Sequence, residues 1–407
     1  MPDSASWPDD DRNRALPLRR RTTHLAAARC RAGFLISEQA KGRYEMRGYY
    51  GKCMGWLSMA VATTILAGGC PGPMTPGDGG TPPGPGQSPG QPAEQPTGKN
   101  PPVDTTTLFV LGQNTGFIGF HGAENLNGVD LPAPIELFSS QTTVVKPRDA
   151  VLDSRGALYV INGAKDGSIA IYDNPNTATG NRPPDRIVFG DTTQLAKNPT
   201  GLAIDRENDL LYVSNGMDDF LVFEIAPSEL FDGDVAPLRT FFIDLPLLRI
   251  EQIRFANGSL YAVDPRGGTS DILAFDDPEA LQGAVMPDRV ISNVGFDNTI
   301  GIDVDAADRM WIGIRDLGEV WMFHDARMLD GAAAPDVALS VADMPISPMP
   351  SFATTDSEDR LYIADSNGNV IFVFDEASEL VGGATPPDRV IDSVELIAPN
   401  RLVAFEQ

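Results

Sequence analysis

The feature that most constrains the fold is a short motif with a central aromatic residue, which recurs six times beyond residue 103. Successive copies lie 49 to 53 residues apart. A fixed period of this length indicates that one supersecondary unit is repeated along the chain. The copies are Leu108-Phe-Val, Leu158-Tyr-Val, Leu211-Tyr-Val, Leu260-Tyr-Ala, Met310-Trp-Ile and Leu361-Tyr-Ile.

Each unit has the pattern of four short strands. An apolar strand and a polar turn precede most copies, as in Leu202-Ala-Ile-Asp205-Arg-Glu-Asn, and Asp and Asn close such turns by binding their own backbone. An alternating strand such as Val370-Ile-Phe-Val-Phe follows, and a Gly- and Pro-containing loop leads to a fourth, such as Arg289-Val-Ile. The spacing leaves no room for crossover helices. We therefore predict an all-β fold, a six-bladed β-propeller over 104–407 with four antiparallel strands per blade.

The two ends of the repeat region complement each other. Pro399-Asn-Arg-Leu-Val-Ala-Phe-Glu matches the first strand of a unit but has no successor, whereas Thr105-Thr-Thr-Leu-Phe-Val matches a second strand without a predecessor. We predict that Leu402–Phe405 pairs with Leu108–Leu111, which closes the ring and removes exposed strand edges.

The repeats resemble the NHL and gluconolactonase-like six-bladed propellers across 104–407. The residues that carry this resemblance are Pro199-Thr-Gly-Leu-Ala-Ile-Asp, Leu211-Tyr-Val-Ser-Asn and Pro287-Asp-Arg-Val-Ile with their counterparts in other units. These are scaffold motifs. Similar blades occur in lactonases, in a peptide-processing lyase, in sensor ectodomains and in binding proteins, so the resemblance implies the fold and leaves the activity open.

Residues 46–69 have the pattern of a bacterial lipoprotein signal peptide. A short cationic segment precedes an apolar run of about 15 residues, which is too short to span a bilayer but suits a signal peptide. The run ends at Leu66-Ala-Gly-Gly-Cys70, which resembles the lipoprotein box whose cysteine carries lipid. The alternative is an ordinary secretory signal with a chance cysteine. Residues 1–45 are Arg-rich and would make the cationic segment too long, so we expect translation to start at Met46 and 1–45 to be a misassigned or disordered extension.

Residues 70–103 have the composition of a tether behind the lipidated cysteine. The stretch from Pro71 to Pro102 contains 11 Pro and 8 Gly, and its reach lies between about 30 Å and about 100 Å. We expect a lipid-anchored protein of the bacterial cell envelope. Pro71, rather than Asp, follows Cys70, so outer-membrane or cell-surface placement is the default.

Charge and composition exclude several functions. The chain carries 31 Lys and Arg against 56 Asp and Glu, a net charge of −25, which excludes nucleic-acid binding through a basic footprint. It also disfavours direct adsorption on anionic lipid, so the membrane is reached only through the anchor. Cys30, Cys53 and Cys70 are the only cysteines, so the repeats hold no disulfide or thiolate. His121 and His324 are the only histidines beyond residue 70, which excludes a multi-histidine metal centre.

Candidate site residues lie where the loops of one propeller face meet the central axis. The candidate ligand or metal residues are Asn162, Asn215, Asp264, Asp365 and Gln252, and the same face is expected to hold Asn114, Asp149, Asn298, Arg315 and Arg401. A ring of Asn and Asp could hold Ca²⁺ or another divalent cation, because these ions favour oxygen ligands. The alternative, which we favour, is that each residue caps a tight turn at a strand end.

The lactonase relatives implied by the resemblance hold a divalent metal with an axial set of one Glu, two Asn and one Asp. Asn162, Asn215 and Asp264 could match the last three, but no Glu matches. We therefore expect neither catalytic residues nor a cofactor. The recurring arginine that opens the fourth strand is expected to pair with the acid that ends the third strand of its own blade: Asp173/Arg186, Glu224/Arg239, Asp276/Arg289 and Asp375/Arg389.

Together these patterns favour a monomeric, lipid-anchored extracytoplasmic scaffold that binds a protein, a peptide or a glycan through one propeller face. The alternative is a divalent-metal-dependent lactonase or hydrolase that works in the central funnel.

Overall fold

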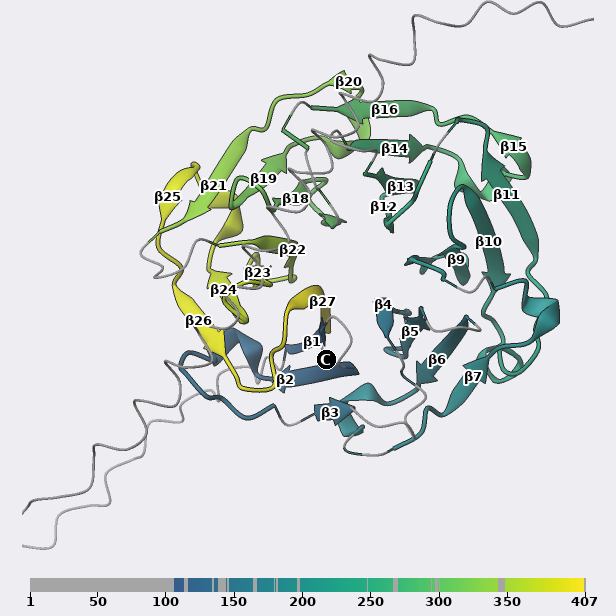
Figure 1. Cartoon of the computed structure of the whole chain (residues 1–407), viewed down its shortest axis with the longest axis horizontal. Coiled ribbons are helices and arrows are strands. Elements are labelled where there is room, and N and C mark those ends of the chain that lie inside the picture. The colour runs from purple at the N-terminus through teal and green to yellow at the C-terminus, as the bar shows by residue number, and fades with distance from the viewer. Residues whose placement is uncertain are drawn as a thin grey trace, which may run out of the picture. The chain divides into compact units, whose positions relative to one another are not determined.

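The computed structural model describes residues 106–405, apart from short segments at 113–115, 134, 138–143, 145, 164–166, 179, 181, 196–197, 247, 266–269, 294, 297–298, 300 and 343–347. The described residues belong to one compact unit, Pro96–Gln407. The predicted extension, signal peptide, lipidated cysteine and tether, 1–103, lie outside the described residues. The predicted fold is confirmed: the described strands form six sheets around a common axis (Figure 1).

Each blade is a meander of four antiparallel strands that runs from the axis outward. Blade 1 contains β27 (Pro399–Phe405), β1 (Thr107–Gly112), β2 (Gly116–His121) and β3 (Ile135–Leu137); blade 2 contains β4 (Pro147–Leu152), β5 (Leu158–Asn162), β6 (Ser168–Tyr172) and β7 (Arg186–Val188); blade 3 contains β8 (Gly201–Asp205), β9 (Leu210–Ser214), β10 (Asp219–Glu224) and β11 (Arg239–Ile243). Blade 4 contains β12 (Gln252–Ala256), β13 (Ser259–Asp264), β14 (Asp271–Phe275) and β16 (Arg289–Ser292); blade 5 contains β17 (Ile302–Val304), β18 (Met310–Ile314), β19 (Glu319–Phe323) and β21 (Val337–Val341); blade 6 contains β22 (Pro350–Thr355), β23 (Leu361–Asp365), β24 (Val370–Phe374) and β26 (Arg389–Asp392).

The ring closes in blade 1, as predicted. β27 from the C-terminal end pairs antiparallel with β1, with Leu108 opposite Ala404 and Leu111 opposite Arg401. The innermost strand of this blade therefore comes from one end of the repeat region and its other three strands come from the other end. This pairing ties the two ends together and leaves neither as a free edge.

Three blades carry a fifth strand that the repeat pattern did not predict. The loop before the outermost strand of one blade adds a short parallel strand to the outer edge of the preceding blade: β15 (Gly283–Val285) on β11, β20 (Gly331–Ala332) on β16 and β25 (Gly383–Thr385) on β21. Single bridges, Val188 with Gly233 and Gly128 with Ile391, mark the same exchange at two further junctions. The exchange covers outer strand edges that would otherwise be open to a foreign chain.

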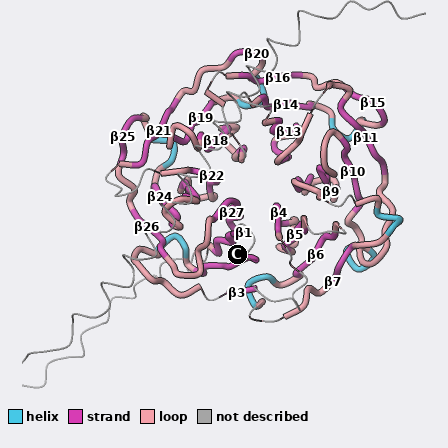
Figure 2. Tube along the Cα trace, viewed as in Figure 1, coloured by secondary structure: helices cyan, strands magenta, loops and turns pink. Residues whose placement is uncertain are grey.

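The hydrophobic core is divided into six clusters, each formed between the facing sides of two neighbouring blades. In the cluster between blades 2 and 3, for example, Tyr159 and Ile171 pack with Leu202 and Phe231. The described helices are short 3₁₀ turns, which Figure 2 shows toward the outside of the ring. None of these described helices is long and apolar enough to cross a membrane.

The aspartate after the innermost strand fixes both the following turn and the motif aromatic. In blade 6, Asp356 Oδ1 accepts the backbone N–H of Arg360, while Oδ2 accepts Arg360 Nε at 2.7 Å and the Tyr362 hydroxyl at 2.9 Å. Burial, with the Asp356 charge, raises the pKa of Tyr362. The same arrangement recurs as Asp305 with Arg309 and Trp311 and as Asp153 with Arg155 and Tyr159.

Candidate functional site: the axial funnel

The innermost strands present alternate residues to the axis, because successive side chains of a strand point to opposite sides. Strand register aligns these residues into two rings of six, one from each blade. The floor ring is Asp149, Gly201, Gln252, Gly301, Phe352 and Arg401. The funnel ring, two residues further along each strand, is Val151, Ala203, Arg254, Asp303, Thr354 and Val403.

The floor ring closes the axial channel. Its four large side chains, from Asp149, Gln252, Phe352 and Arg401, are at most 5% exposed. The glycines make room for them: a Cβ on Gly301 would lie 2.7 Å from Phe352 Cδ2 and 2.6 Å from the Ser351 carbonyl oxygen. The two glycines, one on each side of Gln252, therefore leave room for the four large side chains to fill the centre of the ring.

A buried charge cluster holds the floor ring to the funnel ring. Asp149 accepts the backbone N–H of Leu202 in the next blade at 3.1 Å and Nη1 of Arg254, two blades away, at 3.2 Å. Arg401 Nε lies 3.7 Å from Asp149 Oδ1, and both guanidinium groups lie over the Phe352 ring, at 5.0 Å for Arg254 and 5.9 Å for Arg401. Burial lowers the pKa of Arg401 despite the nearby Asp149 charge.

Asp303 is the acid of the funnel ring. Its Oδ2 accepts the Thr354 hydroxyl at 2.5 Å, and its Oδ1 lies 3.7 Å from Arg254 Nε. Burial raises the pKa of Asp303, and the positive charge of Arg254 opposes that rise. The cluster thus places a partly desolvated carboxyl and a guanidinium next to each other at the bottom of the funnel.

On the side of the funnel ring away from the floor ring, the channel widens into a cavity of about 1140 Å³, which is the funnel. All six funnel-ring residues line it, and it opens on the face that carries the turns between first and second strands, which we call the first-turn face. Ten acidic and three basic side chains line the cavity. Four of these acids are exposed, and the potential inside the funnel therefore favours cationic groups; the four are Glu207, Asp276, Asp277 and Glu279.

Four of the five predicted site residues lie on the opposite face, at the turns between second and third strands, and bind their own turn or the loop that leads into the first strand of their blade. Asn162 donates to Ser168 and Asn215 donates to the Gln194 carbonyl. Asp264 accepts the backbone N–H of Arg249, and Asp365 accepts those of Met349, Asn367 and Gly368. Asp365 thus caps the backbone of its own turn, whereas Asn215 and Asp264 hold the loop that leads into their blade.

Gln252 differs from the other four predicted residues because it belongs to the floor ring. Its Oε1 accepts the backbone N–H of Ile302 in the next blade at 2.7 Å, while its buried Nε2 has no hydrogen-bond partner among the described residues. Asp149 and Arg401 were expected on the same face and also belong to the floor ring. Cys70, Asn114 and Asn298 lie outside the described residues.

The metal site expected from the Asn and Asp pattern stays a prediction. In the described part of the chain, no group of three His, Cys, Asp or Glu side chains is arranged to hold a metal ion. The two histidines of the repeats lie in different blades, where the His121 ring contacts Thr107 and the His324 backbone N–H binds Asp336.

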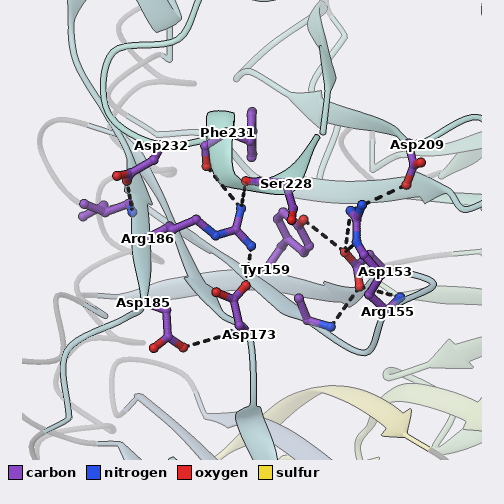
Figure 3. A network of polar contacts seen from close by, with 12 residues as sticks. Asp153, Arg155, Tyr159, Asp173, Asp185, Arg186, Asp209, Ser228, Phe231 and Asp232 are labelled. Carbon is purple, nitrogen blue, oxygen red and sulfur yellow. Dashed lines mark hydrogen bonds and ion pairs between the residues drawn. The ribbon is translucent and has the colours of Figure 1, made fainter. Parts of the chain in front are cut away.

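The repeated arginines pair as predicted in three blades, and in two of these, Arg186 and Arg289, the arginine also binds the next blade. Arg186 pairs with Asp173 and donates through Nη1 to the carbonyls of Ser228 and Phe231 at the 3₁₀ turn η4 (Ser228–Leu230) of blade 3 (Figure 3). Arg289 with Asp276 and Arg389 with Asp375 form the equivalent pairs. The prediction is wrong for Glu224/Arg239: Arg239 donates instead to the Tyr212 hydroxyl and the Pro278 carbonyl, each at 3.4 Å.

Sequence reasoning missed Arg254, Asp303 and Thr354, which form the bottom of the funnel. A usable signal was present, because Arg254 and Asp303 are charged residues inside apolar first strands, Gln252–Ala256 and Ile302–Val304. A charge at a position that alternation assigns to the interior needs a partner, and around a propeller axis that partner lies in another blade.

Comparison with known proteins supports the fold and no finer identity. No family model matches the sequence, and no curated protein is detectably similar. A chain of a nidogen/laminin complex aligns with a TM-score of 0.50 at 13% identity, covering 74% of this chain and 98% of that chain. An uncharacterised protein from Bacteroides caccae aligns at 0.48 and 8% identity, and a putative 6-phosphogluconolactonase from Bacteroides uniformis at 0.46 and 13%, each covering 74% of this chain and 100% of its own. At these identities the likeness concerns the propeller fold alone.

Proposed function

We propose that this chain is a binding protein of the bacterial cell envelope, held by lipid on Cys70, that takes part of a protein, peptide or glycan into the axial funnel. The observation that carries the proposal is the cavity of about 1140 Å³, open on the first-turn face and closed by the floor ring. A concave site of this size, lined by convergent polar groups from several strands, is typical of ligand binding.

The polar groups of the funnel support binding rather than hydrolysis. Several of its aspartates are used to hold turns and motif aromatics, as Asp356 and Asp305 do. They shape and charge the wall but are not free to act on a substrate. No observation favours the metal-dependent lactonase over a binding role, and that alternative stays a prediction.

Photo-crosslinking in cells tests which face binds. A photoreactive residue would replace exposed Ser154 or Ala307, which line the funnel. Matched controls would replace exposed Leu317 or Asn367, which lie in turns on the opposite face. We expect discrete crosslinked species from the funnel positions only. Crosslinks from the control positions alone, or none from either funnel position in the full-length protein, would contradict the proposal.

A further inference from the structure

Arg254 offers two guanidinium nitrogens to the funnel. The residue is only 8% exposed, and its Nη1 makes all the hydrogen bonds that Arg254 donates to described residues, to Asp149 and to the carbonyls of Leu202 and Ile253. Nε lies 3.7 Å from Asp303, beyond hydrogen-bond distance. Arg254 lines the cavity, and its Nε and Nη2 donate no hydrogen bond to a described residue and are not fully buried, which leaves them as a pair of donors for a ligand in the funnel. Two parallel N–H groups of this kind match the two oxygens of a carboxylate.

The other two basic residues of the funnel are already engaged. Arg309 is bound between Asp305 and Asp359, each at 2.6 Å, and exposed Arg206 donates Nε to the Leu152 carbonyl. The remaining lining is strongly acidic. A ligand that fits this charge pattern carries positive charge along its length and a single anionic group at the end that reaches Arg254.

The depth of the funnel suits the end of a polypeptide. The turn aspartates Asp305 and Asp356 follow the funnel ring two residues further along their strands, which is about 7 Å at about 3.3 Å per residue. An extended peptide of about three residues therefore spans the distance from the turns to Arg254. Because the floor ring closes the channel, such a peptide enters end first, and only its C-terminal end carries a negative charge to the guanidinium.

We infer that the funnel recognises the free C-terminal end of a basic peptide or protein, with the α-carboxylate on Arg254 and Lys or Arg side chains against the acidic wall. This inference rests on the proposed function and specifies its ligand class. The fold holds the donors in place before binding, because Asp149 and two backbone carbonyls fix Nη1.

The first test compares two peptides on the unaltered full-length protein by titration calorimetry. The peptide Gly-Lys-Ala-Lys with a free C-terminus should bind at least about tenfold more tightly than its C-terminal amide, the effect expected of one charge-assisted carboxylate contact. The acidic wall alone predicts the reverse, because the amide carries one more net positive charge. Equal binding, tighter binding of the amide, or no binding of either peptide would overturn the inference.

The second test asks whether Arg254 reads the carboxylate. Arg254→Gln should remove the preference for the acid over the amide. Arg206→Gln removes the same charge elsewhere in the funnel and should leave the preference intact. If Arg254→Gln fails to fold by circular dichroism, Arg254→Lys keeps the charge beside Asp149 and should still weaken the preference, since an ammonium gives no bidentate pair. A preference unchanged in the Arg254 variants refutes the assignment.

The two proposals fail in different ways. Crosslinks from the funnel positions without an acid preference would leave the funnel as the binding face and remove the C-terminal ligand. Absence of funnel crosslinks together with crosslinks from the opposite face would remove the proposed function itself.

Discussion

The arginine that opens the fourth strand is expected to stabilise the protein as a link between blades more than as an ion pair within one. Arg289 is 11% exposed as a side chain, and its Nη1 donates to the carbonyls of Ala326 at 3.0 Å and Leu329 at 2.9 Å, the first residue of η6 (Ala326–Met328) of blade 5 and the residue that follows this 3₁₀ turn. Its partner Asp276 is 46% exposed. Two partly buried bonds from a charged donor are together worth about 3 kcal/mol, whereas an exposed ion pair is worth about 0–1 kcal/mol.

Arg289→Met keeps the aliphatic stem and removes the guanidinium, so it should lower the free energy of unfolding by about 3 kcal/mol, which is a fall of about 6 °C in melting temperature. Asp276→Ala should cost no more than about 1 kcal/mol. Urea unfolding of both variants and the parent, analysed by linear extrapolation, measures the difference. Equal losses for the two variants would show that the pair within the blade matters and that the contact with blade 5 does not.

Three further predictions follow from the described contacts. Gly301→Ala should destabilise the protein by about 1–3 kcal/mol in urea unfolding, because the new Cβ collides with Phe352 and the neighbouring backbone; an unchanged midpoint would mean that the floor ring is loosely packed. Burial raises the pKa of Tyr159 and of Tyr212 to about 12. Since an unfolded tyrosine titrates near about 10, the free energy of unfolding should be retained below pH 10 and should fall as the pH rises from there toward 12. Melting curves and the 295 nm absorbance of tyrosinate would follow this fall, and no fall in that window would contradict the burial effect. Chelation with EDTA should leave the melting temperature unchanged, because the predicted cation ligands already bind turn backbone and side chains; a fall reversed by added Ca²⁺ would instead establish the metal site.

Much of the fold could be predicted because it repeats. A period near 50 residues with four strand patterns per unit limits the architectures, and the unmatched strands at the two ends define the closure between β1 and β27. The fifth strands were missed because they are two or three residues long, as in Gly331–Ala332, and pair with another blade. Such segments have no alternation of their own, and only their position beside a neighbouring outer edge makes them strands.

The candidate site was harder to predict, because it depends on side chains that meet across the axis. Sequence reasoning found polar residues at strand ends, and two of them, Asn162 and Asp365, bind within their own turns. The floor ring closes one end of the channel because its six residues, one from each blade, pack together in one plane. The sequence of a single strand does not reveal how these six residues fit. Arg254 reaches Asp149, 105 residues away in the chain, and this contact has no local signature.

At three described junctions a blade adds an outer strand to the blade before it, which gives the ring a direction. When blade 4 opens, β15 leaves β11 and blade 3 loses its covering; when blade 3 opens, blade 4 keeps β20, which comes from blade 5. Destabilisation of one blade should therefore weaken the blade before it more than the blade after it. Amide hydrogen exchange in a protein destabilised within one blade would show a larger loss of protection in the preceding blade than in the following one.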